Sequence, residues 1–119
     1  MTHETLTMDA SFVQVQTSVG DRQDAERIAS RIVARRLAAC VQIFGPISSV
    51  YQWQGSVETA SEWLCIAKTK REAAPALIEE IRALHVYKVP EIIVTPILGG
   101  STPYLTWIAE ETRTVPVDV

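Results

Sequence analysis

The sequence predicts one α+β domain in which two β-α-β units follow each other and a further helix ends the fold. Three observations predict it: strand and helix patterns alternate in that order, a hairpin joins the two units, and no linker or low-complexity segment interrupts the 119 residues. Apolar residues make up 47% of the chain, which is enough for a packed core and excludes a disordered protein. We therefore expect a single domain over residues 1–119, with residues 1–10 disordered.

The first strand and the first helix show different periodicities. Residues 11–19 alternate apolar and polar side chains, which is typical of a strand with one buried face. Gly20 and Asp21 break this pattern, and Asp21 suits the N-cap of a helix. Apolar residues then recur at helical spacing as far as Leu37. The predicted buried stripe of this helix is Ala25, Ile28, Ala29, Ile32, Val33 and Leu37.

A long hairpin is predicted next. Residues 40–53 and 57–69 are rich in β-branched and aromatic side chains, and residues 54–56 form the turn between them. Gly45-Pro46 lies in the middle of the first of these strands, where proline cannot donate to the ladder, so we expect a bulge or bend there. A hairpin of this length extends beyond so small a domain. Its tip would be unstable unless something else packs against it.

The second half repeats the order and adds a helix. A helix is predicted over residues 72–84, with Pro75 in its first turn, and a loop over residues 85–90. Residues 91–98 follow as a strand, in which Pro96 favours an edge position or a bulge. Three further features complete the chain: Gly99-Gly100 ends this strand, a short helix covers residues 101–112, and the tail 114–119 adds a short strand. This order describes a ferredoxin-like fold, an antiparallel sheet with both helices on one face plus a C-terminal helix.

Charge and cysteine content limit the function classes. A net charge of −3 offers no basic excess for nucleic acid, and no apolar stretch approaches the roughly 20 residues that span a membrane. Without a bulge in the hairpin, Cys40 would lie opposite Thr69. Cys65 would lie opposite Phe44, too far along the ladder for a disulfide, so both cysteines are expected to be small buried residues. We expect a cytoplasmic protein that is not an enzyme, because no catalytic triad, phosphate loop or close carboxylate pair can be assembled.

Short motifs in a fixed order carry a resemblance to a known family. They are LAACV at 37–41, SVYQWQG at 49–55, HVY at 85–87, VPE at 89–91 and YLTW at 104–107, together with Glu62, Leu64 and Lys68-Thr69. This pattern resembles the CutA family of divalent-cation tolerance proteins. The resemblance implies a ferredoxin-like subunit in a homotrimer whose hairpins pair with neighbouring subunits, and a link to divalent metals, of which copper is most often named. The family trimer is similar in plan to the PII proteins, which bind small molecules in clefts between subunits.

The candidate metal ligands are His85 and Cys40. Family members associated with copper carry a cysteine and a further histidine at positions that are Thr17 and Leu84 here. His85 also suits capping at a helix end, and Cys40 suits a buried structural role; both structural interpretations are favoured. Copper or another divalent cation is therefore expected as an optional ligand and not as an obligatory cofactor.

Aromatic and charged residues from the motifs are the candidates for a cleft or an interface between subunits: Tyr51, Trp53, Glu62, Lys68, Tyr87, Glu91 and Trp107. They fit a ligand pocket, although aromatic packing at a subunit interface is the favoured interpretation. Glu62 and Lys68 share one strand face but lie about 20 Å apart, so each must meet a group from elsewhere. The competing hypotheses are a PII-like sensor that binds a small molecule between subunits, around Lys68, Tyr87 and Trp107, and an oligomeric scaffold for partner proteins that binds nothing small.

Overall fold

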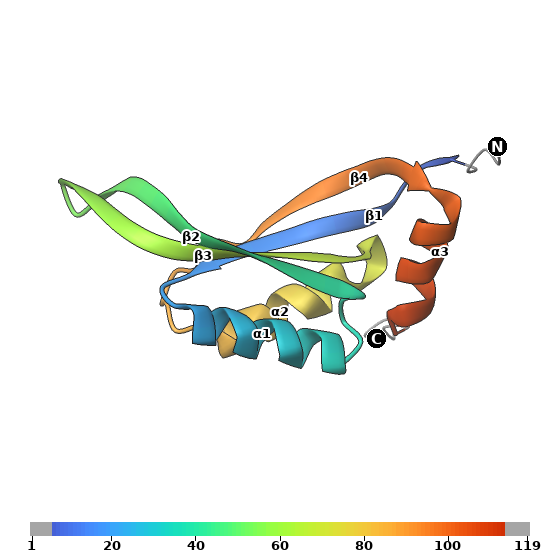
Figure 1. Ribbon diagram of the computed structural model, residues 1–119, viewed down its shortest axis with the longest axis horizontal. Helices are drawn as coiled ribbons and strands as arrows, with labels where there is room; N and C mark the ends of the chain where they lie inside the picture. The colour runs from blue at the N-terminus through green and yellow to red at the C-terminus, as the bar shows by residue number, and fades with distance from the viewer. Residues whose placement is uncertain (1–5, 114–119) are drawn as a thin grey trace.

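The computed structural model describes residues 6–113 and shows a four-stranded antiparallel sheet in the order β2-β3-β1-β4. The helices α1 and α2 cover one face of this sheet, and α3 packs across its end (Figure 1). The predicted ferredoxin-like order with an added helix is confirmed, and the predicted tail strand at 114–119 lies outside the described residues. The elements are β1 (Leu6–Val19), α1 (Arg22–Ala34), β2 (Cys40–Trp53), β3 (Ser56–Lys70), a 3₁₀ turn (Arg71–Ala73), α2 (Ala74–Leu84), β4 (Ile93–Ser101) and α3 (Thr102–Glu111).

The core forms where the apolar stripes of α1 and α2 meet the covered face of the sheet. Its largest fully buried side chains include Ile28, Ile32, Leu37, Leu77 and Ile81. The helix α1 ends at Ala34, earlier than predicted, because Arg36 turns the backbone with a φ of 59° and lets Leu37 N–H donate to Ile32 O at 3.0 Å. Val33, expected in the stripe, is 38% exposed.

The first strand and the last strand are both longer than the sequence predicts. Disorder was expected for residues 1–10, but β1 begins at Leu6 and pairs with β4 from Leu6–Ser101 to Met8–Gly99. The prediction that Gly99-Gly100 ends the strand is also wrong. A Cβ at Gly99 would overlap the Met8 side chain and the Thr7 carbonyl, so glycine permits this close strand approach. Pro96 lies in β4, an edge strand, as predicted.

The predicted bulge in the hairpin is confirmed, and it changes the register of the cysteines. Phe44 pairs with Leu64 and Ile47 pairs with Glu62, so that Gly45 and Pro46 together oppose Trp63. Cys40 therefore lies opposite Lys68 and Cys65 opposite Ile43, one residue away from the expected partners; both thiols are free. Cys65 is buried, and burial raises its pKa to about 11. The expectation of a buried Cys40 is wrong, because this side chain is only partly buried.

Candidate functional site

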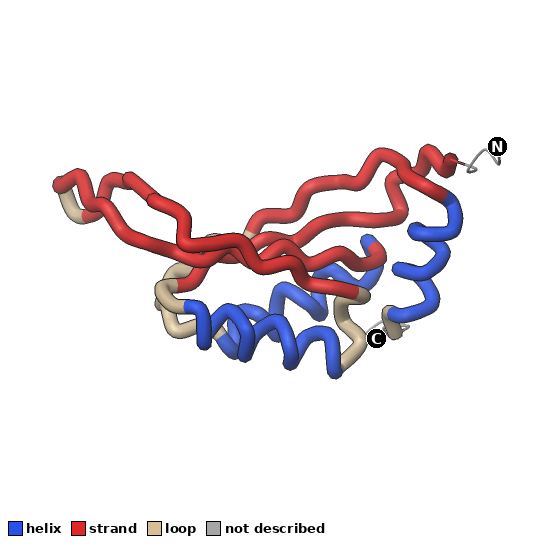
Figure 2. Tube along the Cα trace, in the orientation of Figure 1, coloured by secondary structure: helices blue, strands red, loops and turns tan. Residues whose placement is uncertain are grey.

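The hairpin extends well beyond the helices (Figure 2), and a groove of about 800 Å³ opens where it leaves the sheet. The walls come from the end of β1, from both hairpin strands and from the loop that follows α2. The lining residues are Ser18, Ser49, Val50, Tyr51, Trp53, Glu62, Val86, Tyr87, Lys88, Val89 and Glu91. Five of the predicted cleft residues thus meet in one place: Tyr51, Trp53, Glu62, Tyr87 and Glu91.

The bulge explains how aromatic side chains of β2 reach this groove. On the tip side of the bulge Tyr51 pairs with Glu58, which lies on the same face of β3 as Glu62. On the base side, the extra residue keeps Val41 and Ile43 packed against the helix-covered core. Without the bulge, β2 could not place Tyr51 on the groove face and Val41 and Ile43 on the core face together. A shift of one residue in register moves every side chain to the other face of the sheet.

Glu62 is the central charged group of the groove. Only 8% of this residue is exposed, and Tyr87 Oη donates a hydrogen bond of 3.0 Å to its carboxylate. No lysine or arginine within residues 6–113 forms an ion pair with it. Burial, and then the hydrogen bond and negative charge of Glu62, raise the pKa of Tyr87 to about 12, so the phenol stays protonated and acts as donor.

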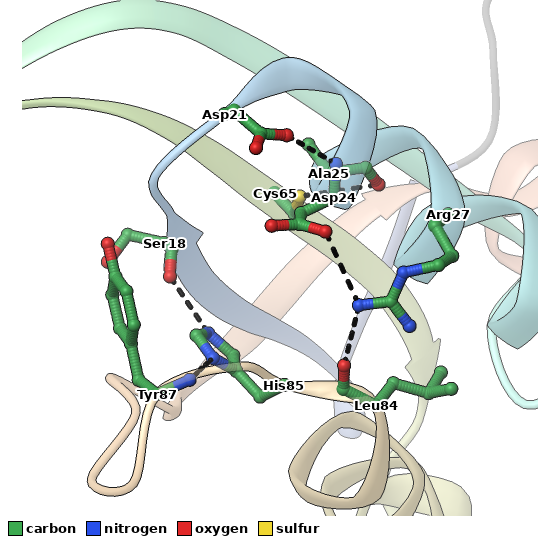
Figure 3. Close-up of polar contacts among 9 residues, drawn as sticks. All are labelled: Ser18, Asp21, Asp24, Ala25, Arg27, Cys65, Leu84, His85 and Tyr87. Atoms are coloured by element: carbon green, nitrogen blue, oxygen red, sulfur yellow. Dashed lines mark hydrogen bonds and ion pairs between the residues drawn. The ribbon is translucent and has the colours of Figure 1, made fainter.

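The loop that carries Tyr87 is held by His85 (Figure 3). His85 Nε2 donates to Ser18 O at 2.9 Å, and Tyr87 N–H donates to His85 Nδ1 at 3.0 Å. Both ring nitrogens are therefore occupied, and no lone pair is left for a metal ion. Arg27 supports the same corner from α1, because Nη2 donates to Leu84 O at 2.7 Å. In this arrangement His85 positions the loop.

The other predicted residues lie at the opposite end of the sheet, beside α3. Lys68 Nζ lies 3.4 Å from Tyr104 Oη, and Cys40 Sγ lies 3.7 Å from the same oxygen. The tilted rings of Tyr104 and Trp107 have their centroids 5.5 Å apart. One chain therefore does not bring Lys68 and Trp107 to Tyr87. Since Cys40 pairs with Lys68 and Ser18 with Leu64, the two metal candidates are separated by about 13 Å of strand. The described part of the chain holds no group of three or more His, Cys, Asp or Glu suited to a metal.

Several contributing residues were missed from the sequence. Tyr104 was identified only as part of a helix and a motif, yet it contacts both Lys68 and Cys40. Ser18 was taken as a strand position, although the alternation of residues 11–19 places it on the open face beside Leu64. Gly20 makes room for Tyr87 Oη, which a Cβ there would approach to 3.3 Å. No local pattern signals these contacts, because each joins segments far apart in the chain.

Comparisons with known proteins agree with this architecture. The sequence model of the CutA1 divalent ion tolerance protein family matches residues 13–111. The divalent-cation tolerance protein CutA of Thermus thermophilus is 44% identical over 98 residues, which cover 82% of this chain and 95% of that protein. The chloroplastic CutA of Arabidopsis thaliana is 44% identical over 101 residues, or 85% of this chain; the chain spans 56% of that plant protein.

Solved structures give the same result. The Thermus thermophilus Cut A1 structure has a TM-score of 0.83 and 42% sequence identity, covering 86% of this chain and 99% of that one. The CutA structure from Synechococcus elongatus has a TM-score of 0.88 at 31% identity, with 92% and 96% of the two chains covered. With a family match over most of its length and relatives above 40% identity, the chain belongs to the CutA1 divalent ion tolerance protein family.

Proposed function

We propose that this chain acts in divalent-ion tolerance as a homotrimeric, non-catalytic protein, and that assembly covers its hairpin. The observation that carries the proposal is the apolar surface of a hairpin that no other part of the described chain covers. Val50 and Val57 are 67% and 65% exposed, and Trp53 between them is also exposed. The register places Val50 and Val57 on one face of the hairpin and Trp53 on the other, so both faces expose apolar side chains. Exposed apolar surface of this kind usually marks an interface, and a two-stranded hairpin is only marginally stable alone.

Light scattering on the purified protein tests the assembly. The expected mass is three times that of the 13.2 kDa chain, and Trp53→Ala is expected to shift the protein toward smaller species on dilution. Trp107→Ala is a second interface variant, at the α3 end of the sheet. A wild-type mass of one chain, or variants that stay trimeric at every dilution, would count against the proposal.

The link to divalent ions is proposed to work without His85 as a resident ligand. Both ring nitrogens of His85 are engaged, and Cys40 lies at the far end of the sheet. Titration with Cu(I), Cu(II) and Zn(II) is therefore expected to show no tight site that depends on these two residues. Saturable binding of one ion per chain, lost in both His85→Ala and Cys40→Ser, would reverse this assignment and favour copper or another divalent cation as a bound ligand.

A second candidate role is that of a small-molecule sensor, and the groove favours it. A concave site lined by aromatic side chains and a few fixed polar groups is typical of ligand pockets. Thermal-shift measurements with a metabolite panel test this role, because a ligand that binds the folded state raises the melting temperature.

We place the protein in the cytoplasm on the basis of its two free cysteines, a proposal that cell fractionation tests. No helix in residues 6–113 is long and apolar enough to cross a membrane.

A further inference from the structure

The face of β3 that α1 and α2 leave uncovered carries two charged side chains of opposite sign. Ala67 is buried in the helix-covered core, so the even-numbered residues of β3 lie on the opposite face of the sheet. These residues include Glu62, Leu64, Ile66 and Lys68. The two charged positions are six residues apart, about 20 Å along the strand, so they cannot neutralise each other within one chain.

Each of the two charged groups contacts a tyrosine hydroxyl and lacks an ionic partner. Tyr87 Oη donates to the Glu62 carboxylate at 3.0 Å, and Lys68 Nζ donates to Tyr104 Oη at 3.4 Å. Among the side chains that the structure describes, none forms an ion pair with Glu62 or Lys68. Glu62 is only 8% exposed, and a nearly buried carboxylate is costly to maintain unless a cation compensates it.

Other cations of the chain are engaged elsewhere. Four arginines of α1 and its C-terminal end form ion pairs with carboxylates of α1 and α2, on the helix side of the sheet: Arg22, Arg27, Arg31 and Arg35. Lys70 forms an ion pair with Glu72. Lys88 lines the groove beside Glu62 but forms no ion pair with it. Lys68 therefore stands on the uncovered face as a cation that no described carboxylate neutralises.

The placement of the two charges suits a head-to-tail contact between copies of the chain. Glu62 lies at the hairpin end of β3 and Lys68 at the α3 end, with the apolar side chains of Leu64 and Ile66 between them. A head-to-tail contact joins two different patches, and it closes into a ring when the rotation between copies allows. In a ring of three copies, each chain would give its carboxylate to one neighbour and its ammonium to the other, which leaves neither charge uncompensated.

We propose that Lys68 of one copy forms an ion pair with Glu62 of the next copy, and that three such pairs orient the chains in the ring. The inference rests on the assembly proposed above and names the residues that join its subunits. The hydroxyls of Tyr87 and Tyr104 meet at the same junction, because each is bonded to one member of the pair. Charge complementarity of this kind excludes other orientations of the copies, since they would bring like charges together.

Charge reversal at the two positions, singly and together, tests the pair in the full-length protein. Light scattering over a dilution series gives the concentration at which half of the assembly has dissociated. This concentration is expected to rise about tenfold or more in Glu62→Lys and in Lys68→Glu, because each places like charges at every junction. In the double variant it is expected to fall about tenfold or more below that of either single variant. A tyrosine hydroxyl can bond to either charge, so the exchange keeps both local contacts.

A neutral cycle covers the case in which a reversal unfolds the chain, which circular dichroism would show. Glu62→Gln and Lys68→Met each leave one charge unpaired, and the double variant removes both. The double variant is therefore expected to dissociate less readily than the product of the two single effects predicts. Effects that simply multiply would overturn the inference, because residues 20 Å apart in one chain and unpaired between chains act independently.

The matched control exchanges the charge of Glu62 with the lysine of its own groove, as Glu62→Lys/Lys88→Glu. It is expected to restore nothing. Rescue by this control would assign the counterion to the same chain and overturn the inference. A double variant no better than the single ones, or single reversals that leave dissociation unchanged, would overturn the ion pair and leave a wild-type trimer standing. A wild type with the mass of one chain would remove both the assembly and the pair.

Discussion

The base and the tip of the hairpin are parts of one continuous strand pair, yet different forces hold them. At the base, Val41, Ile43 and Cys65 pack against the helix-covered core, and burial fixes the register. At the tip no helix of the described chain covers the two strands, and the turn at Gln54-Gly55 fixes the register. The two registers differ by one residue, and the bulge at Gly45-Pro46 reconciles them. The groove lies on the tip side of this junction, where its aromatic residues need not serve the core.

The largest expected effect comes from removing one bulge residue. Deleting Pro46 forces one register on the whole hairpin, so either Val41 and Ile43 leave the core or Tyr51 leaves the groove face. If Val41 and Ile43 leave the core, we expect a loss of about 3 kcal/mol in the free energy of unfolding, since two partly buried β-branched side chains lose their packing; if Tyr51 leaves the groove face instead, the loss is smaller. Urea denaturation measures it. Deleting Gly45 instead should be equally harmful, because the count of residues sets the register; a stable product from either deletion would contradict this account.

Replacing His85 tests how firmly the groove loop is attached to the sheet. His85→Ala removes the hydrogen bonds to Ser18 O and from Tyr87 N–H and leaves a largely buried carbonyl without this partner. We expect a loss of about 2 kcal/mol, with faster amide exchange at Tyr87. His85→Gln is the control, because its amide can restore the donor to Ser18. Unchanged exchange in His85→Ala would mean that the loop is held by other contacts.

Tyr87→Phe examines the hydrogen bond within the groove. The expected loss is about 1 kcal/mol at neutral pH, because Glu62 loses a donor while the ring remains. The raised pKa of Tyr87 means that the fold favours the protonated phenol. Its contribution is fully present below pH 10.0 and is lost as the pH rises through about 12. The wild type should therefore lose stability more steeply than Tyr87→Phe over this range, and parallel pH profiles would exclude the proposed coupling.

Thr17 places an unsatisfied polar group in the buried core. Its side chain is 1% exposed, and the hydroxyl finds no hydrogen-bond partner among the described residues. Thr17→Val keeps the shape and removes the unsatisfied group, so we expect a gain of about 1 kcal/mol. Thermal unfolding measures the change, with Thr69→Val as the opposite case: Thr69 Oγ1 donates to Leu37 O at 2.7 Å, and its loss should destabilise. A destabilised Thr17→Val would indicate that the hydroxyl has a partner.

The smallest expected effect lies at the hairpin turn. Gln54 and Gly55 have φ values of 49° and 82°, the two positive angles of a type I′ turn. Asparagine tolerates the left-handed region better than glutamine, so Gln54→Asn should stabilise the protein by about 0.5 kcal/mol. Urea denaturation of the variant, with Gln52→Asn as a control in the strand, measures the gain. Equal shifts in the two variants would show that the turn angle is not responsible.

Part of the candidate site was predicted from the sequence motifs, and part of it was not. Tyr51, Trp53, Glu62, Tyr87 and Glu91 were named from motifs and do meet in the groove. Within one chain Lys68 and Trp107 lie at the other end of the sheet, beside α3, so the cleft between subunits that would join them to Tyr87 stays a prediction. The role of His85 depends on a carbonyl 67 positions away in the chain, which no spacing rule reaches.

The sequence by itself determined the order of the elements, the start of the first helix, the hairpin turn and the place of the bulge. These follow from periodicity and from residues such as Asp21, Pro75 and Gly45-Pro46, which act within a few positions of themselves. Only the tertiary structure decided that β1 and β4 continue to Leu6 and Ser101, that His85 is a positioning residue, and that Glu62 lacks a cation within the described chain. The physical reason is that pairing, burial and charge compensation are set by segments far apart in sequence, whose encounter no local pattern encodes.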